Sequence, residues 1–98
     1  MNIAPLEQKN LYALVVESTF TGDIEIETVE NISTFMEKNG LNYSESSKMM
    51  KDFLDKRFGG YHQVVIGESF GFNIAHDASN LLHANFGNAS ILIWKKQS

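Results

Sequence analysis

The sequence predicts an α+β fold in which two helices pack against a mainly antiparallel sheet. The main observation is a change in hydrophobic period along the chain. Apolar side chains recur every three or four positions over residues 21–60, as in helices, and alternate with polar ones after Gly60, as in strands. Helices and strands that are segregated in this way favour an antiparallel sheet. We therefore expect the order β-α-α-β-β-β-β in a single domain, residues 1–98.

The first part of the chain is expected to contain an arm, a strand and a helix. Residues 1–10 are polar and include the only proline, which is typical of a flexible N-terminal arm. Residues 11–18, LYALVVES, are rich in β-branched side chains and predict a strand. The first helix is expected over residues 21–40, with Thr21 as its N-cap and acidic residues in its first turn. Its apolar face comprises Val29, Ile32 and Met36, with Ile26 and Phe35 on the flanks.

The second helix is expected over residues 44–60, with Ser44 as its N-cap and two glycines at its end. Its apolar face comprises Met50, Phe53 and Leu54. After this helix we expect strands at residues 61–66, 69–77, 80–86 and 89–95. A tight turn at Gly87-Asn88 is expected to join the last two strands.

The composition excludes several classes of function. The net charge is −4, and residues 1–49 hold three Lys/Arg against eight Asp/Glu. The sequence therefore lacks the clustered basic residues that nucleic-acid binding requires. There is no cysteine, which excludes disulfides and thiolate metal sites. The longest apolar run, residues 13–16, is far shorter than the roughly 20 residues of a membrane span. No secretory signal is expected at the N-terminus.

Residues 67–71, GESFG, match the G-x-S-x-G motif of serine hydrolases, and Ser69, Asp77 and His83 follow in the matching triad order. That motif requires a turn from a strand into a helix, whereas a segment of strand period follows Ser69. A chain of 98 residues also cannot supply the alternating strands and helices of such an enzyme. We therefore expect no catalysis, and a small hydrolase using Ser69 is kept only as a remote alternative.

The three histidines do not predict a metal site. His62, His76 and His83 lie fourteen and seven residues apart, which matches no usual ligand spacing. No glycine-rich phosphate loop precedes a helix. We expect neither a metal nor another cofactor.

The expected strand SFGFNIAHD, residues 69–77, is the most informative segment. A glycine inside a strand, here Gly71, often marks the close approach of another backbone. If this strand is at an edge, another chain is expected to pair with its open hydrogen-bonding side. That chain is either a strand exchanged with an identical subunit or an extended peptide. The other interpretation is an interior strand of a monomer.

The stretch KDFLDKRFGGYHQVVIGESFGFNIAHDASNLLHANFGNASILIWKK, residues 51–96, resembles the small dynein light chains of the eight-kilodalton class. The segments VVIGESFGFNIAHD and IWK are most similar to the axonemal subgroup, and the resemblance extends back to ALVVES. It implies a strand-swapped homodimer with two grooves that bind extended peptides of dynein intermediate chains or other partners. It also implies a non-enzymatic subunit in the cytoplasm and cytoskeleton, in a microtubule motor complex or the axoneme of a cilium, with no nucleic acid or membrane as partner.

The resemblance also implies which residues of this chain form the two interfaces. The peptide-binding residues are Tyr43, Ser44, Phe70, Gly71, Phe72, Asn73, Ile74, Ala75, His76, His83 and Asn85. The dimer-interface residues are His62, Gln63, Phe72, Asn73 and Ala75. A monomeric subunit of an axonemal dynein that pairs with one dedicated partner is the alternative within this family.

The chain departs from the best-known members at several of these positions. Tyr43-Ser44 stand where those members carry Glu-Lys to hold a peptide glutamine, and His83 and Asn85 replace two tyrosines of the groove wall. His62-Gln63 align with a Trp-His pair whose histidine lies at the dimer interface. We therefore expect the scaffold of the family with a different peptide preference.

Overall fold

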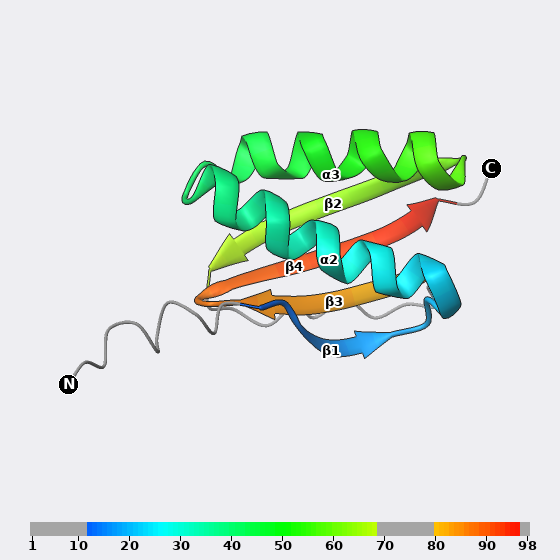
Figure 1. Ribbon diagram of the computed structural model, residues 1–98, viewed down its shortest axis with the longest axis horizontal. Helices are drawn as coiled ribbons and strands as arrows, with labels where there is room; N and C mark the ends of the chain where they lie inside the picture. The colour runs from blue at the N-terminus through cyan, green and yellow to red at the C-terminus, as the bar shows by residue number, and fades with distance from the viewer. Residues whose placement is uncertain (1–11, 69–79, 97–98) are drawn as a thin grey trace.

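The computed structural model describes residues 12–68 and 80–96. These residues form two helices and four strands in one α+β unit (Figure 1). In chain order the elements are β1 (Leu14–Ser18), α2 (Gly22–Asn39), α3 (Tyr43–Phe58), β2 (Tyr61–Glu68), β3 (Leu81–Phe86) and β4 (Ala89–Lys96). The predicted fold class and the predicted order of these six elements are confirmed. The remaining predicted strand, residues 69–77, lies outside the described residues, as does the N-terminal arm.

The four strands form one antiparallel sheet in the order β1-β3-β4-β2. The hairpin of β3 and β4 pairs Phe86 with Ala89, which confirms the predicted tight turn at Gly87-Asn88. Gly87 has a φ of 61°, a left-handed conformation that glycine adopts without a side-chain clash. Since β3 and β4 occupy the centre, β1 and β2 form the two edges of the sheet.

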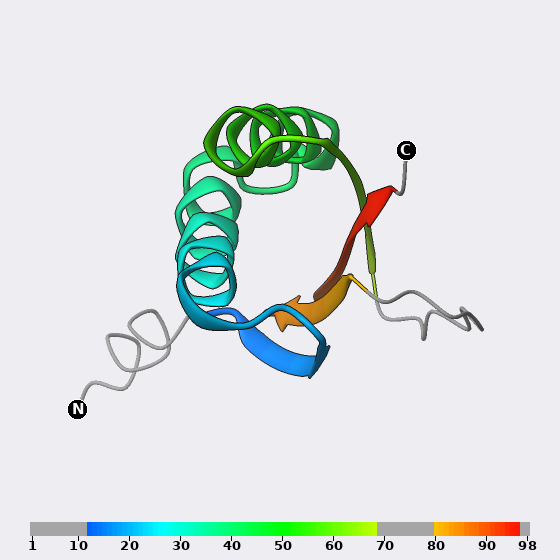
Figure 2. The same cartoon turned by 90° about the vertical axis from the view of Figure 1, so that its right-hand side faces the viewer.

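Both helices lie over the same face of the sheet (Figure 1), and Figure 2 shows the interior that helices and sheet enclose. The core between them is built from side chains of α2, α3, β3 and β4 and of residues beside β1, and Val64 and Ile66 of β2 pack against it. Its buried members are Ala13, Phe20, Ile32, Met36, Met50, Leu54, Leu82, Ala84, Phe86, Ala89, Ile91 and Ile93. Burial of this apolar area is the main contribution to the stability of the fold.

Helix α2 follows its predicted pattern on the core side. Ile32 and Met36 are buried, and Val29 and Phe35 pack against the core from the sides. Ile26 is 56% exposed, so the apolar face does not extend to it. Thr21 stands at the predicted N-cap position, although its side chain makes no capping hydrogen bond.

The N-cap of helix α3 is Asn42, two residues before the predicted cap, and the helix begins at Tyr43. The Asn42 side chain accepts a hydrogen bond from the Glu45 backbone N–H over 3.2 Å, as an N-cap residue does for the third amide of a helix. The prediction of Ser44 as the cap was wrong, because Ser44 already lies within the helix. Met50 and Leu54 are buried as predicted, and Gly59 ends the helix. Within residues 12–68 and 80–96, no helix is long and apolar enough to cross a membrane.

Candidate functional site

Strand β2 is an edge strand with an open hydrogen-bonding side. All eight of its residues pair with β4, from Tyr61 opposite Lys96 to Glu68 opposite Ala89. Among the described residues, no strand pairs with its other side. A long unpaired edge of this kind can accept one further strand, from the same protein or from another.

The side chains of β2 alternate between the two faces of the sheet. His62, Val64 and Ile66 point toward the helices, since His62 is buried and the other two pack against the core. Tyr61 and Val65 point to the opposite face and are 62% and 40% exposed. The helices thus cover one face of β2 and leave the other uncovered.

The face of the sheet opposite the helices carries several apolar side chains. Val65 stands beside Leu92 in the register of β2 and β4, and Leu81 stands beside Trp94 in that of β3 and β4. Figure 2 shows both helices on the opposite side of the sheet, and we call the side away from them the outer face. Leu81 and Leu92 are nevertheless buried, at 9% and 2% exposure. The exposed apolar side chains of β2 on this face are Tyr61 and Val65, and they are a candidate contact for another chain.

His62 is fixed to its own protomer by helix α3. The Asp55 carboxylate accepts the His62 backbone N–H over 2.7 Å, and the same oxygen lies 2.8 Å from His62 Nδ1. The other Asp55 oxygen is 2.6 Å from Lys51 Nζ. Burial tends to raise the pKa of Asp55, but the hydrogen bonds from Lys51 and His62 outweigh it and hold that pKa below its ordinary value. Asp55 therefore links α3 to the beginning of the edge strand β2.

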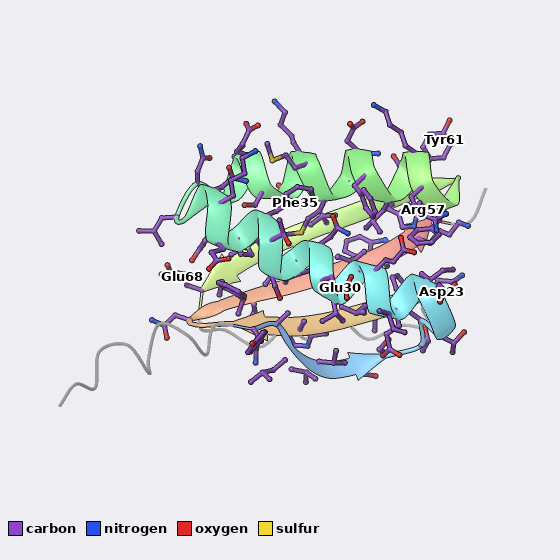
Figure 3. The ribbon with its side chains drawn as sticks, viewed as in Figure 1. Asp23, Glu30, Phe35, Arg57, Tyr61 and Glu68 are labelled. Atoms are coloured by element: carbon purple, nitrogen blue, oxygen red, sulfur yellow. The ribbon has the colours of Figure 1, made fainter. Side chains whose placement is uncertain are left out.

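Tyr43 connects the beginning of α3 to the end of β2. Its hydroxyl donates a hydrogen bond to Glu68 Oε2 over 2.9 Å. Burial, followed by the hydrogen bond and the negative charge of Glu68, raises the pKa of Tyr43. Figure 3 shows Glu68 at the end of the sheet where β2 finishes. Ser44, the neighbouring residue of the predicted site, is exposed.

A pocket of about 310 Å³ opens beside this bond. It lies where the link between the two helices meets the β3–β4 turn, and its lining includes Leu41, Tyr43, Glu68, Phe86 and Asn88. Glu68 was not predicted as a site residue, because the sequence gives no sign that residues 43 and 68 meet. The pocket places a carboxylate and a phenol at the end of the open strand edge.

The structure places His83 and Asn85 on the outer face. They alternate along β3 with Leu82, Ala84 and Phe86, which belong to the core. Asn85 Oδ1 accepts a hydrogen bond from Ser90 Oγ on β4 over 2.9 Å. Within one chain, these two residues and Tyr43-Ser44 therefore lie on opposite sides of the sheet.

Gln63, predicted at the dimer interface, stands opposite Trp94 in the register of β2 and β4. The remaining predicted site residues lie outside the described residues, as does Ser69; they are Phe70, Gly71, Phe72, Asn73, Ile74, Ala75 and His76. Over residues 12–68 and 80–96, no group of three or more His, Cys, Asp or Glu side chains is arranged to hold a metal ion.

The fold and its open edge define a class of protein, and comparison with known proteins identifies that class. The family model described as "Dynein light chain type 1" matches residues 12–96, nearly the whole chain. The chain belongs to the dynein light chain family. Proteins of this family are generally structural and non-catalytic.

Relatives with closely similar sequences are axonemal. The chain is 38% identical over 93 residues to proteins named dynein axonemal light chain 4 from Homo sapiens and Sus scrofa. The similarity covers 94% of this chain and 89% of each relative.

Solved structures share the fold at low sequence identity. The dynein light chain-like domain of the Fasciola hepatica calcium-binding protein FhCaBP2 aligns with a TM-score of 0.77 and 18% identity, over 90% of this chain and 94% of that one. A similar domain of CsTAL3 aligns with a TM-score of 0.73 and 17% identity, over 88% and 94%. These likenesses support the fold alone.

Proposed function

We propose that this chain is a non-catalytic light chain of an axonemal dynein. In this proposal it forms a homodimer and binds extended segments of intermediate chains or other partners by strand addition. The observation that carries the proposal is the open edge of β2, which runs beside α3 and pairs with β4 along its whole length on the other side. Family membership and the axonemal relatives support the motor assignment and a location in the axoneme.

Two features support a homodimer. The outer face of β2 presents two exposed apolar side chains, Tyr61 and Val65, that a second copy would cover. The site residues of α3 and β3 lie on opposite faces of one sheet, so one protomer alone cannot bring them together. In the proposed dimer, the strand around Phe70 to Ala75 crosses to the partner and pairs with its β2 edge.

The peptide would then add to the exchanged strand, next to the beginning of α3. Main-chain hydrogen bonds supply affinity for any extended segment, and pockets for alternate side chains supply specificity. Tyr43 and Ser44 lack the carboxylate and ammonium that would pair with a peptide glutamine, and Tyr43 already donates its hydroxyl to Glu68. A glutamine-centred peptide should therefore bind at least about 10-fold more weakly here than to the best-known family members, or about 1.4 kcal/mol.

The oligomeric state tests the proposal directly. Light scattering after size exclusion should give about twice the chain mass of 11.0 kDa at micromolar concentration. Asn73→Pro should shift the mass toward the monomer by removing a strand hydrogen-bond donor. A monomer mass for the unmodified protein would overturn the dimer and favour a subunit that pairs with one dedicated partner.

Peptide titration tests the binding site separately. Gly71→Val should abolish binding of intermediate-chain peptides while the dimer mass is unchanged, because a bulky side chain would block approach to the exchanged strand. Low-micromolar affinity for a glutamine-centred peptide would refute the altered preference. Turnover of short-chain esters that is lost in Ser69→Ala would refute the non-catalytic assignment.

The dimer should also resist mild acid. Gln63 stands where an interfacial histidine is expected in the family, and glutamine does not titrate between about pH 7 and pH 5. The dimer mass should therefore change little over this range. Complete dissociation between about pH 7 and pH 5 would show that another group controls the interface.

A further inference from the structure

The opposite edge of the sheet, at β1, carries a second exposed apolar surface. Its members are Tyr12, Leu14, Val15, Val16 and Ile26, which are 63%, 68%, 43%, 55% and 56% exposed, and we call them the β1 patch. Leu14 stands opposite Asn85 on the outer face and Val15 opposite Ala84 on the helix-facing side, so the patch wraps around the edge, and the register shifts between Val15 and Glu17. Strand β1 pairs with β3 on one side, and no described strand pairs with the other. The β1 patch thus combines apolar side chains with an unpaired strand edge.

The helices do not cover the β1 patch. Val15 stands opposite Ala84, whose side chain is fully buried in the core, so Val15 lies on the helix-facing side of the sheet and is still 43% exposed. A hydrogen bond joins helix α2 to the residue before the strand, since Ser33 Oγ accepts the Ala13 backbone N–H over 3.0 Å. Ile26 lies two turns before Ser33 on the same side of α2, and so extends the patch from the strand onto the helix.

The surroundings of the β1 patch are acidic. Residues 12–37 contain no Lys or Arg, and their six acidic residues are Glu17, Asp23, Glu25, Glu27, Glu30 and Glu37. Only Glu27 among these makes an ion pair that the described residues show, with Arg57 at 3.0 Å. Asp23 and Glu30, labelled in Figure 3, belong to the part of α2 that runs beside β1. A partner of the patch must therefore carry positive charge to be attracted to it.

We propose that the β1 patch binds an extended segment of a partner protein in which apolar side chains alternate with Lys or Arg. The backbone of this segment adds to the β1 edge, its apolar side chains contact Val15 and Ile26 on the helix-facing side, and its cations lie beside Glu17 on the outer face. A second copy of this chain is disfavoured because it would bring the same acidic residues together. This site is independent of the β2 edge, which lies at the other side of the sheet.

The test uses amide spectra of the isotope-labelled full-length chain. The probe is a short peptide in which Val alternates with Lys, and its matched control has Glu in place of each Lys. The Lys peptide should shift the amides of residues 12–18 and of Ile26, and its affinity should fall as salt is raised from about 0.05 M to 0.5 M. Shifts confined to Tyr61–Glu68, equal binding of the Glu peptide, or no shift at millimolar peptide would each overturn the proposal.

Matched variants locate the site on the strand. Val16→Lys places a like charge in the middle of the β1 patch, and it should weaken binding of the Lys peptide at least about 10-fold. Leu41→Lys makes the same kind of change at an 81% exposed residue outside the patch, and it should leave the affinity unchanged. Glu17→Gln gives a second readout, since it should reduce the salt dependence while the apolar side chains of the β1 patch are unchanged. Unchanged affinity in Val16→Lys, with a folded spectrum, would refute the site, and the dimer mass should stay the same in all three variants.

Discussion

Two aspartates on α3 provide a sharp test of what holds the edge strand in place. Asp55 and Asp52 each face a lysine at i,i+4 spacing, at 2.6 Å from Lys51 and 3.2 Å from Lys56. Their side chains differ in exposure, 22% for Asp55 and 66% for Asp52. Only Asp55 also binds His62, through the backbone N–H and Nδ1. The same substitution at the two positions therefore separates an exposed ion pair from a link between helix and sheet.

Asp55→Ala should destabilise the protein by about 2–4 kcal/mol. It leaves two donors of His62 without their acceptor, on a residue that is 2% exposed, and each buried unsatisfied group costs about 1–3 kcal/mol. The two costs are not fully additive, because the ring and its surroundings can relax. Asp55→Asn retains an acceptor oxygen and should cost about 1–2 kcal/mol. Asp52→Ala removes an exposed ion pair worth at most about 1 kcal/mol.

Urea unfolding at one protomer concentration measures these differences, since a dimer would make stability depend on concentration. Because the pKa of Asp55 lies below its ordinary value of 3.8 in the folded protein, its charge stabilises the fold above the unfolded pKa. That contribution is lost as the pH falls through the folded pKa. The stability gap between the unmodified protein and Asp55→Asn should thus be constant near neutral pH and shrink below pH 3.8. A gap of less than about 1 kcal/mol between Asp55→Ala and Asp52→Ala would refute the link.

Two further predictions concern the core and the end of the β2 edge. Leu54→Ala should cost about 2–5 kcal/mol in urea unfolding, since Leu54 is 1% exposed in the core, whereas Leu41→Ala, at 81% exposure, should stay within about 0.5 kcal/mol. In an ultraviolet titration of the tyrosines, Tyr43→Phe should remove a phase with a raised pKa, and Glu68→Gln should move that phase to lower pH. A titration curve that does not change in Glu68→Gln would show that Glu68 has no part in raising this pKa.

The sequence predicted those parts of the fold that depend on periodicity and local chemistry. The apolar face of α2, around Ile32 and Met36, and the turn at Gly87 need only neighbouring residues, and both were confirmed. The predicted N-cap of α3 was wrong because asparagine and serine are both common at N-caps. This statistical preference does not decide between Asn42 and Ser44. The choice depends on how the chain leaves α2, which the sequence alone does not specify.

From the sequence, site residues could be predicted only at positions that align with the family. Tyr43 was singled out by alignment, but its bond to Glu68 joins residues 25 positions apart and follows from the packing of α3 on β2. The contact between His62 and Asp55, seven residues apart in the chain, likewise follows from the tertiary structure. The β1 patch was not predicted at all, because LYALVVES has the same composition whether its strand lies inside a sheet or at an edge.

The two edges of this sheet offer different surfaces to extended chains, and the difference is electrostatic. Beside β2, helix α3 presents both signs of charge, with Lys51 and Lys56 paired to Asp55 and Asp52. Near β1, by contrast, residues 12–37 hold six acidic side chains and no basic one. A strand that adds to β2 is therefore chosen by main-chain pairing and pocket shape, whereas one that adds to β1 must be basic. A single sheet with edges of this kind can hold two different partners, because neither edge favours the segment that suits the other.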